Sequence, residues 1–79
     1  MKKDDKLLQI MTNVFPSANI PKDWKGLELG NPKEWDSLGN FSLLMSIEES
    51  YNFKFSIEQM SEVTTINQIL EIVNNLDHD

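Results

Sequence analysis

Apolar residues recur at three- and four-residue spacing in three stretches of this chain, residues 3–15, 37–51 and 66–76. That spacing is typical of amphipathic helices, each of which must bury its apolar side. A chain of 79 residues is near the lower size limit for one hydrophobic core. The three helices are therefore predicted to share one core in a single domain, residues 1–79.

Local signals predict where the helices begin and end. Pro16 ends the first helix, and a long connection holding all three prolines runs from there to Asp36. Ser56 is expected to cap a short helix over about residues 57–61, and Thr65 begins the last helix with a capping-box pattern. The predicted fold class is all-α: a small four-helix bundle, with three longer helices, one short helix and a long loop between helices one and two.

The expected core consists of the apolar stripes and of three residues of the long connection that pack across the helices. A short helical turn is expected near Trp24. The expected core comprises Leu7, Leu8, Met11, Val14 and Phe15, then Trp24, Leu27 and Leu29, then Leu38, Phe41, Leu44, Met45 and Ile47, then Met60 and Val63, and finally Ile66, Ile69, Leu70, Val73 and Leu76.

The charge is negative and unevenly distributed. The formal net charge is −6, with +2 over residues 1–33 and −8 over residues 34–79. Nucleic acid is not an expected partner, because phosphate binding needs clustered Lys and Arg and the chain has no arginine. Acidic surfaces attract basic partner proteins, although they also serve solubility.

The composition excludes several classes of protein. Without cysteine there is no disulfide framework and no thiolate metal site, which favours a cytoplasmic protein. No apolar run is long enough for a signal peptide or a membrane span. Enzyme activity is not expected, because His78, the one histidine, lies in the terminal tail and cannot join a serine in a rigid catalytic pair. Neither catalytic nor metal-binding residues are predicted.

Asp36 and Ser37 stand at the start of the second helix. Either side chain is a good cap for the unpaired N–H groups of a first helical turn, and capping alone would explain an isolated Asp-Ser-Leu. A serine hydroxyl at a helix N-terminus is also accessible to another enzyme, and a phosphodiester there would meet the positive end of the helix dipole. Because an unactivated serine is a poor nucleophile, the modifying enzyme would supply the base and the metal.

The order of features along the chain resembles the acyl carrier protein family over essentially its whole length. The features are Asp36-Ser37-Leu38, Glu48-Glu49, the aromatic residues Tyr51 and Phe53, and Val63-Thr64-Thr65-Ile66. The resemblance implies that Ser37 carries 4′-phosphopantetheine, transferred from coenzyme A by a phosphopantetheinyl transferase. It further implies a monomer that holds acyl or aminoacyl cargo as a thioester. An acyl- or aminoacyl-loading ligase would attach the cargo, and downstream transferases or synthases would receive it.

The resemblance also implies a docking surface for these enzymes. By similarity it comprises Asp36, Leu38, Met45, Glu48 and Glu49, where apolar residues lie beside charges that meet basic patches. For Leu38 and Met45 the alternative, that they are core residues at helical spacing, stays open.

Some positions depart from the pattern of bacterial fatty acid carriers. Gly39 and Ser42 stand where such carriers usually have acidic residues. Trp-Asp-Ser-Leu-Gly is similar to stand-alone carriers of specialised pathways, and Asp-Ser followed by a large apolar residue and Gly is also similar to D-alanyl carrier proteins. Met60 and Ile69 are large where fatty acid carriers are often small, which leaves less room between the helices and favours a short or polar cargo. Two alternatives to a carrier of a specialised pathway stay open. One is a general fatty acid carrier, and the other is an unmodified acidic helical adaptor that binds a partner through residues 37–51.

Overall fold

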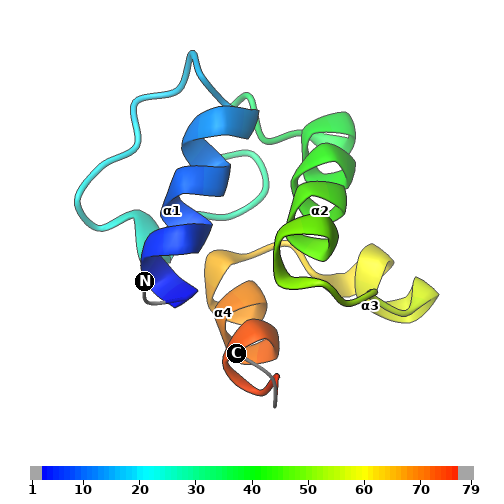
Figure 1. The fold of residues 1–79 in the computed structure, drawn as a ribbon. Coiled ribbons are helices and arrows are strands. Elements are labelled where there is room, and N and C mark those ends of the chain that lie inside the picture. The colour runs from blue at the N-terminus through cyan, green and yellow to red at the C-terminus, as the bar shows by residue number, and fades with distance from the viewer. Residues whose placement is uncertain (1–2, 77–79) are drawn as a thin grey trace.

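The computed structural model describes residues 3–76, with side chains from Asp5 onward, so His78 lies outside the described residues. This part of the chain forms four α-helices and no β-strand, as the all-α prediction requires (Figure 1). The helices are α1 (Lys3–Val14), α2 (Ser37–Tyr51), α3 (Ile57–Glu62) and α4 (Ile66–Asn74). A short 3-10 turn, η1 (Trp24–Gly26), interrupts the connection between α1 and α2, close to where a helical turn was predicted.

Side-chain caps determine where three of the helices begin. Asp36 is the N-cap of α2, and its carboxylate accepts a hydrogen bond from the Gly39 N–H. Ser56 and Thr65 form capping boxes at the starts of α3 and α4. The predicted helix starts are confirmed, whereas α4 ends at Asn74, before the end of its predicted apolar stripe.

The helices α1 and α2 lie side by side and run in opposite directions (Figure 1). The short helix α3 lies on the side of α2 away from α1, and α4 lies below the pair and contacts α1. Within residues 3–76, no helix is both long and apolar enough to cross a membrane.

The connection between α1 and α2 contributes to the core and pairs with the start of α4. Trp24 and Leu27 are buried, as predicted. The Ile66 N–H donates to the Leu27 carbonyl at 3.1 Å, and the Leu29 N–H donates to the Thr64 carbonyl at 2.7 Å. The Leu29 side chain is 39% exposed, so its predicted place in the core is wrong: its backbone, and not its side chain, fixes it to the fold.

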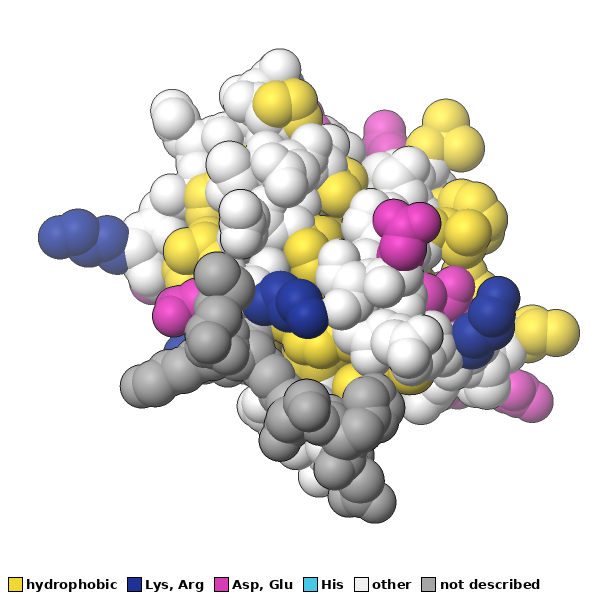
Figure 2. All heavy atoms as spheres, in the orientation of Figure 1, with side chains coloured by type: hydrophobic (Ala, Val, Ile, Leu, Met, Phe, Trp, Pro, Cys, Tyr) yellow, Lys and Arg dark blue, Asp and Glu magenta, His cyan; other side chains and the backbone are white. Residues whose placement is uncertain are grey.

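The predicted apolar stripe of α2 is wrong at three positions. Leu38, Phe41 and Met45 are 81%, 57% and 47% exposed, respectively. Leu44 and Ile47 are buried as predicted, and the rest of the buried side of α2 comprises Asn40, Leu43 and Tyr51. Both sets have helical spacing, and only one side of a helix can face the core. Figure 2 shows hydrophobic side chains standing out at the edge of the molecule formed by α2 and α3.

Candidate functional site

Ser37 is the first residue of α2, and its side chain is exposed. Sequence alone left two candidates for the cap, and the structure assigns that role to Asp36, whose Oδ1 lies 2.8 Å from the Gly39 nitrogen. The Ser37 hydroxyl makes no hydrogen bond to the described part of the chain. The hydroxyl is therefore available at the mouth of a helix, next to N–H groups that favour a negatively charged substituent.

The residues before Ser37 are held firmly through Trp35, whose side chain is wholly buried. The backbone N–H of Trp35 donates to the Pro32 carbonyl at 3.0 Å, and the backbone carbonyl of Trp35 accepts from the Gly30 N–H at 2.7 Å. Its ring lies 6.2 Å from that of Phe15, centroid to centroid, which ties the segment to the end of α1. An exposed hydroxyl thus stands on a backbone with little freedom to move.

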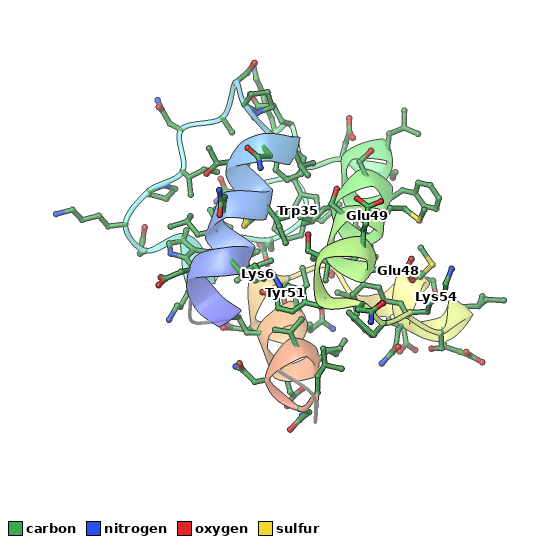
Figure 3. The ribbon with its side chains drawn as sticks, in the orientation of Figure 1. Lys6, Trp35, Glu48, Glu49, Tyr51 and Lys54 are labelled. Atoms are coloured by element: carbon green, nitrogen blue, oxygen red, sulfur yellow. The ribbon has the colours of Figure 1, made fainter. Side chains whose placement is uncertain are left out.

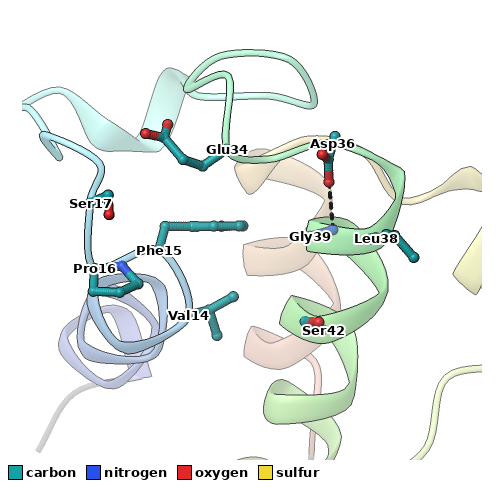
Figure 4. A pocket seen from close by; sticks show the side chains of 9 residues that line it. All are labelled: Val14, Phe15, Pro16, Ser17, Glu34, Asp36, Leu38, Gly39 and Ser42. Atoms are coloured by element: carbon teal, nitrogen blue, oxygen red, sulfur yellow. Dashed lines mark hydrogen bonds between the residues drawn. The ribbon is translucent and has the colours of Figure 1, made fainter.

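Gly39 allows the segment before Ser37 to approach α2 closely. A Cβ at this position would lie 2.5 Å from the Glu34 carbonyl oxygen and 2.9 Å from the Phe15 ring. Figure 4 shows the Phe15 side chain directed toward Gly39 and the Asp36 carboxylate above it. Since the first obstacle is backbone, any larger residue would push the segment holding Ser37 away from the helix.

Two surface pockets flank the first turn of α2. One, of about 220 Å³, lies between the end of α1 and the start of α2 (Figure 4) and is lined by Val14, Phe15, Pro16, Ser17, Glu34, Asp36, Leu38, Gly39 and Ser42. The other, of about 260 Å³, includes Ser37 itself and is lined further by Leu29, Asn40, Phe41, Leu44, Met60, Ser61 and Thr64. Ser37 therefore lines the second pocket together with the apolar side chains of Leu29, Phe41, Leu44 and Met60.

The structure decides one alternative for the predicted docking residues. Leu38 and Met45 are exposed, so their interpretation as core residues is wrong, whereas their docking role stays a prediction. Phe41 was predicted in the core but lies on this same outer side of α2. Its exposure is a feature that sequence reasoning missed, because an aromatic residue at helical spacing usually belongs to the core.

Two of the three predicted docking carboxylates, Glu48 and Glu49, lie in different environments (Figure 3). Glu48 is half-buried, and its Oε2 accepts a hydrogen bond from the Phe55 N–H at 2.8 Å. Glu49 is exposed. Glu48 therefore holds the segment after α2 in place, and Glu49 is the carboxylate more available to another protein.

The groups around Ser37 provide no catalytic machinery of their own. Residues 3–76 contain no histidine, and no three His, Cys, Asp or Glu side chains of this region are placed to hold a metal ion. Asp36, the nearest carboxylate in sequence, is engaged as a cap. The described residues thus present Ser37 as an exposed hydroxyl beside a carboxylate that is engaged as a helix cap.

A curated protein to which the chain is similar is an acyl carrier protein of Coprothermobacter proteolyticus (strain ATCC 35245 / DSM 5265 / OCM 4 / BT). The two are 26% identical over 74 residues, which cover 90% of each chain. No protein-family profile and no solved structure matches the chain.

Proposed function

We propose that this protein is a carrier that holds acyl or aminoacyl intermediates as thioesters on a 4′-phosphopantetheine arm attached to Ser37. The observation that carries the proposal is the exposed, unpaired Ser37 hydroxyl at the N-terminus of α2, with Asp36 providing the cap in its place. The similarity to an acyl carrier protein along 90% of the chain supports a carrier role in general.

The residues around Ser37 fit the arm. Attachment forms a bond between the Ser37 oxygen and the phosphorus of the 4′-phosphate of coenzyme A. The bond between that phosphorus and the bridging oxygen of the diphosphate breaks, so adenosine 3′,5′-bisphosphate leaves. The proton of the hydroxyl passes to a base of the transferase. The resulting phosphodiester is anionic and lies where the unpaired N–H groups of α2 favour negative charge. The terminal thiol of the arm supplies the thioester chemistry that a chain without cysteine lacks.

The proposed docking surface is the outer side of α2. Leu38 and Met45 supply exposed apolar area, while Asp36 and Glu49 supply negative charge. Glu48 contributes less directly, because one of its oxygens is already bonded to the Phe55 N–H. The expected partners are a phosphopantetheinyl transferase, a loading ligase and downstream transferases or synthases that present basic patches around an apolar centre.

We further propose a short or polar cargo and a specialised pathway in the cytoplasm. Ile69 is wholly buried, and Met60 packs against the core beside the pocket that includes Ser37. Both side chains fill space that a long acyl chain would need between the helices. Gly39 and Ser42 give the front of α2 no negative charge of their own.

Intact mass spectrometry tests the attachment directly. The protein is incubated with coenzyme A, Mg²⁺ and a broad-specificity phosphopantetheinyl transferase. The wild type is expected to gain the mass of one phosphopantetheine group. Ser37→Ala should gain nothing, whereas Ser42→Ala, which removes another exposed hydroxyl of α2, should be labelled like the wild type. A folded wild type that stays unlabelled would refute the carrier function and favour the adaptor.

A further inference from the structure

A chain of two hydrogen bonds passes beneath Ser37. The Trp35 indole N–H donates to Asn40 Oδ1 at 2.8 Å, and Asn40 Nδ2–H donates to the Val63 carbonyl at 3.2 Å. Val63 is the C-cap of α3. This Trp35–Asn40–Val63 bridge therefore links the residue before the N-cap of α2, the first turn of α2 and the end of α3.

Asn40 is the one buried polar side chain among the described residues, at 9% exposure. Its neighbours on the inner side of α2, Leu43 and Leu44, are apolar, as that environment favours. A primary amide offers an acceptor and a donor at once, and the bridge uses both. An apolar residue here would leave the buried Trp35 N–H and the Val63 carbonyl without these partners, which is unfavourable.

The bridge completes the fixation of the backbone on both sides of Ser37. On one side the main chain of Trp35 is held by Gly30 and Pro32. On the other, the Asn40 N–H donates to the Asp36 carbonyl at 2.7 Å. Within this frame the side-chain bridge adds a direct link between the start of α2 and the end of α3. Those two helices carry the exposed apolar residues Leu38, Phe41, Met45 and Ile57.

We propose that Asn40 is a positioning residue for the modification of Ser37. The bridge fixes the Ser37 backbone relative to the rest of α2 and to the end of α3, so that an enzyme docked on the outer side of α2 meets the hydroxyl at one place. This inference rests on the proposed carrier function. Group transfer depends on the alignment of the attacking oxygen, and a displacement of about 1 Å can lower a rate by about 100-fold.

Transfer kinetics on full-length variants test the role of Asn40. Asn40→Leu removes both hydrogen bonds while keeping the branched skeleton of the side chain, and Trp35→Phe removes the indole N–H while keeping an aromatic ring. Val73→Ala is the control, since it truncates a wholly buried side chain of α4 outside the bridge. Initial rates of phosphopantetheine transfer are measured at a temperature where circular dichroism shows every variant folded.

A positioning role predicts a specific pattern of rates. Asn40→Leu should lower kcat by about 10- to 100-fold with little change in KM, since the docking residues are intact. Trp35→Phe should act in the same direction, and the double variant should be no slower than Asn40→Leu alone, because both remove one connected unit. Val73→Ala should react at the wild-type rate. The inference is overturned if folded Asn40→Leu reacts like the wild type, or if Val73→Ala is slowed as much.

Trp35→Phe decides the question alone if Asn40→Leu does not fold. An unlabelled wild type refutes the carrier function, and with it the proposal that Asn40 positions Ser37 for that reaction.

Amide hydrogen exchange tests whether the Trp35–Asn40–Val63 bridge fixes the backbone at Ser37 even if the protein is not a carrier, because it needs no transferase. The Gly39 N–H should exchange at least about tenfold faster in Asn40→Leu than in Val73→Ala, and equal exchange rates would show that the bridge does not fix the site.

Discussion

The two sides of α2 both carry apolar residues, but one side is buried and the other is exposed. The inner side packs Leu43, Leu44 and Ile47 into the core, whereas the outer side leaves Leu38, Phe41 and Met45 exposed. Ser37 and Glu49 also present their side chains to solvent, while the polar group of Asn40 is bonded within the fold. The apolar residues of this helix therefore form two surfaces: one is packed into the core, and the other is exposed and includes the residues that we propose for docking.

Neighbouring residues on the two sides give the sharpest contrast. Leu44→Ala should reduce the free energy of unfolding by about 2–5 kcal/mol, because it leaves a cavity in the core. Met45→Ala should change it by no more than about 0.5 kcal/mol, since that side chain is 47% exposed. Urea denaturation followed by circular dichroism measures both values. Equal losses would show that the outer side is not a free surface.

Gly39 lies at the boundary between the two sides. Gly39→Ala should lower the free energy of unfolding by about 1–3 kcal/mol, because the new Cβ would collide with the Glu34 carbonyl and the Phe15 ring. Gly26→Ala is the matched control, since nothing lies within 4 Å of a Cβ there. Thermal unfolding compares the two, and a Gly39→Ala variant as stable as Gly26→Ala would contradict the close approach at α2.

Lys6 contacts the C-terminal end of α2, the end opposite Ser37 (Figure 3). Its Nζ donates to the Ser50 carbonyl at 2.8 Å and lies 4.8 Å from the centre of the Tyr51 ring. Lys6→Met keeps the aliphatic stem but removes the cation, so a loss of about 1 kcal/mol in the free energy of unfolding is expected. Lys22→Met, at an exposed position of the connection, should have almost no effect in the same denaturation experiment.

Glu48 and Glu49 give the smallest expected difference in stability. Glu48→Ala should reduce the free energy of unfolding by about 0.5–1.5 kcal/mol through loss of the bond to the Phe55 N–H, while Glu49→Ala should reduce it by less than about 0.5 kcal/mol. In the labelling assay Glu49→Ala should have the larger effect of the two if Glu49 contacts a partner. That variant should have a higher KM than the wild type, and its KM should depend less on salt concentration. A Glu49→Ala variant with unchanged KM at low salt would remove Glu49 from the docking surface.

The starts of the helices could be predicted from sequence because they depend on local chemistry. Asp36 at the start of α2 and Thr65 at the start of α4 each cap N–H groups within a few residues, so the signal lies in the adjacent sequence. The place of Ser37 at a helix start indicated an accessible hydroxyl in the same way, whereas its role as the attachment site was implied by the resemblance to acyl carrier proteins.

The orientation of α2 could not be predicted, because it depends on contacts distant in sequence. Leu38, Phe41 and Met45 have the same spacing as the residues that face the core, so periodicity alone admits either side. The burial of Asn40 depends on the carbonyl of Val63, in another part of the chain. The one local hint was Trp35, since a buried indole N–H needs an acceptor and an amide follows five residues later.

The exposed position of Ser37 has a practical consequence in a chain that contains no cysteine. A Ser37→Cys variant would have a single thiol, placed at the mouth of α2. Maleimide or disulfide reagents could then install dyes, spin labels or synthetic pantetheine mimics at that one point. Distances from such a probe to docked proteins would become measurable without any enzymatic loading.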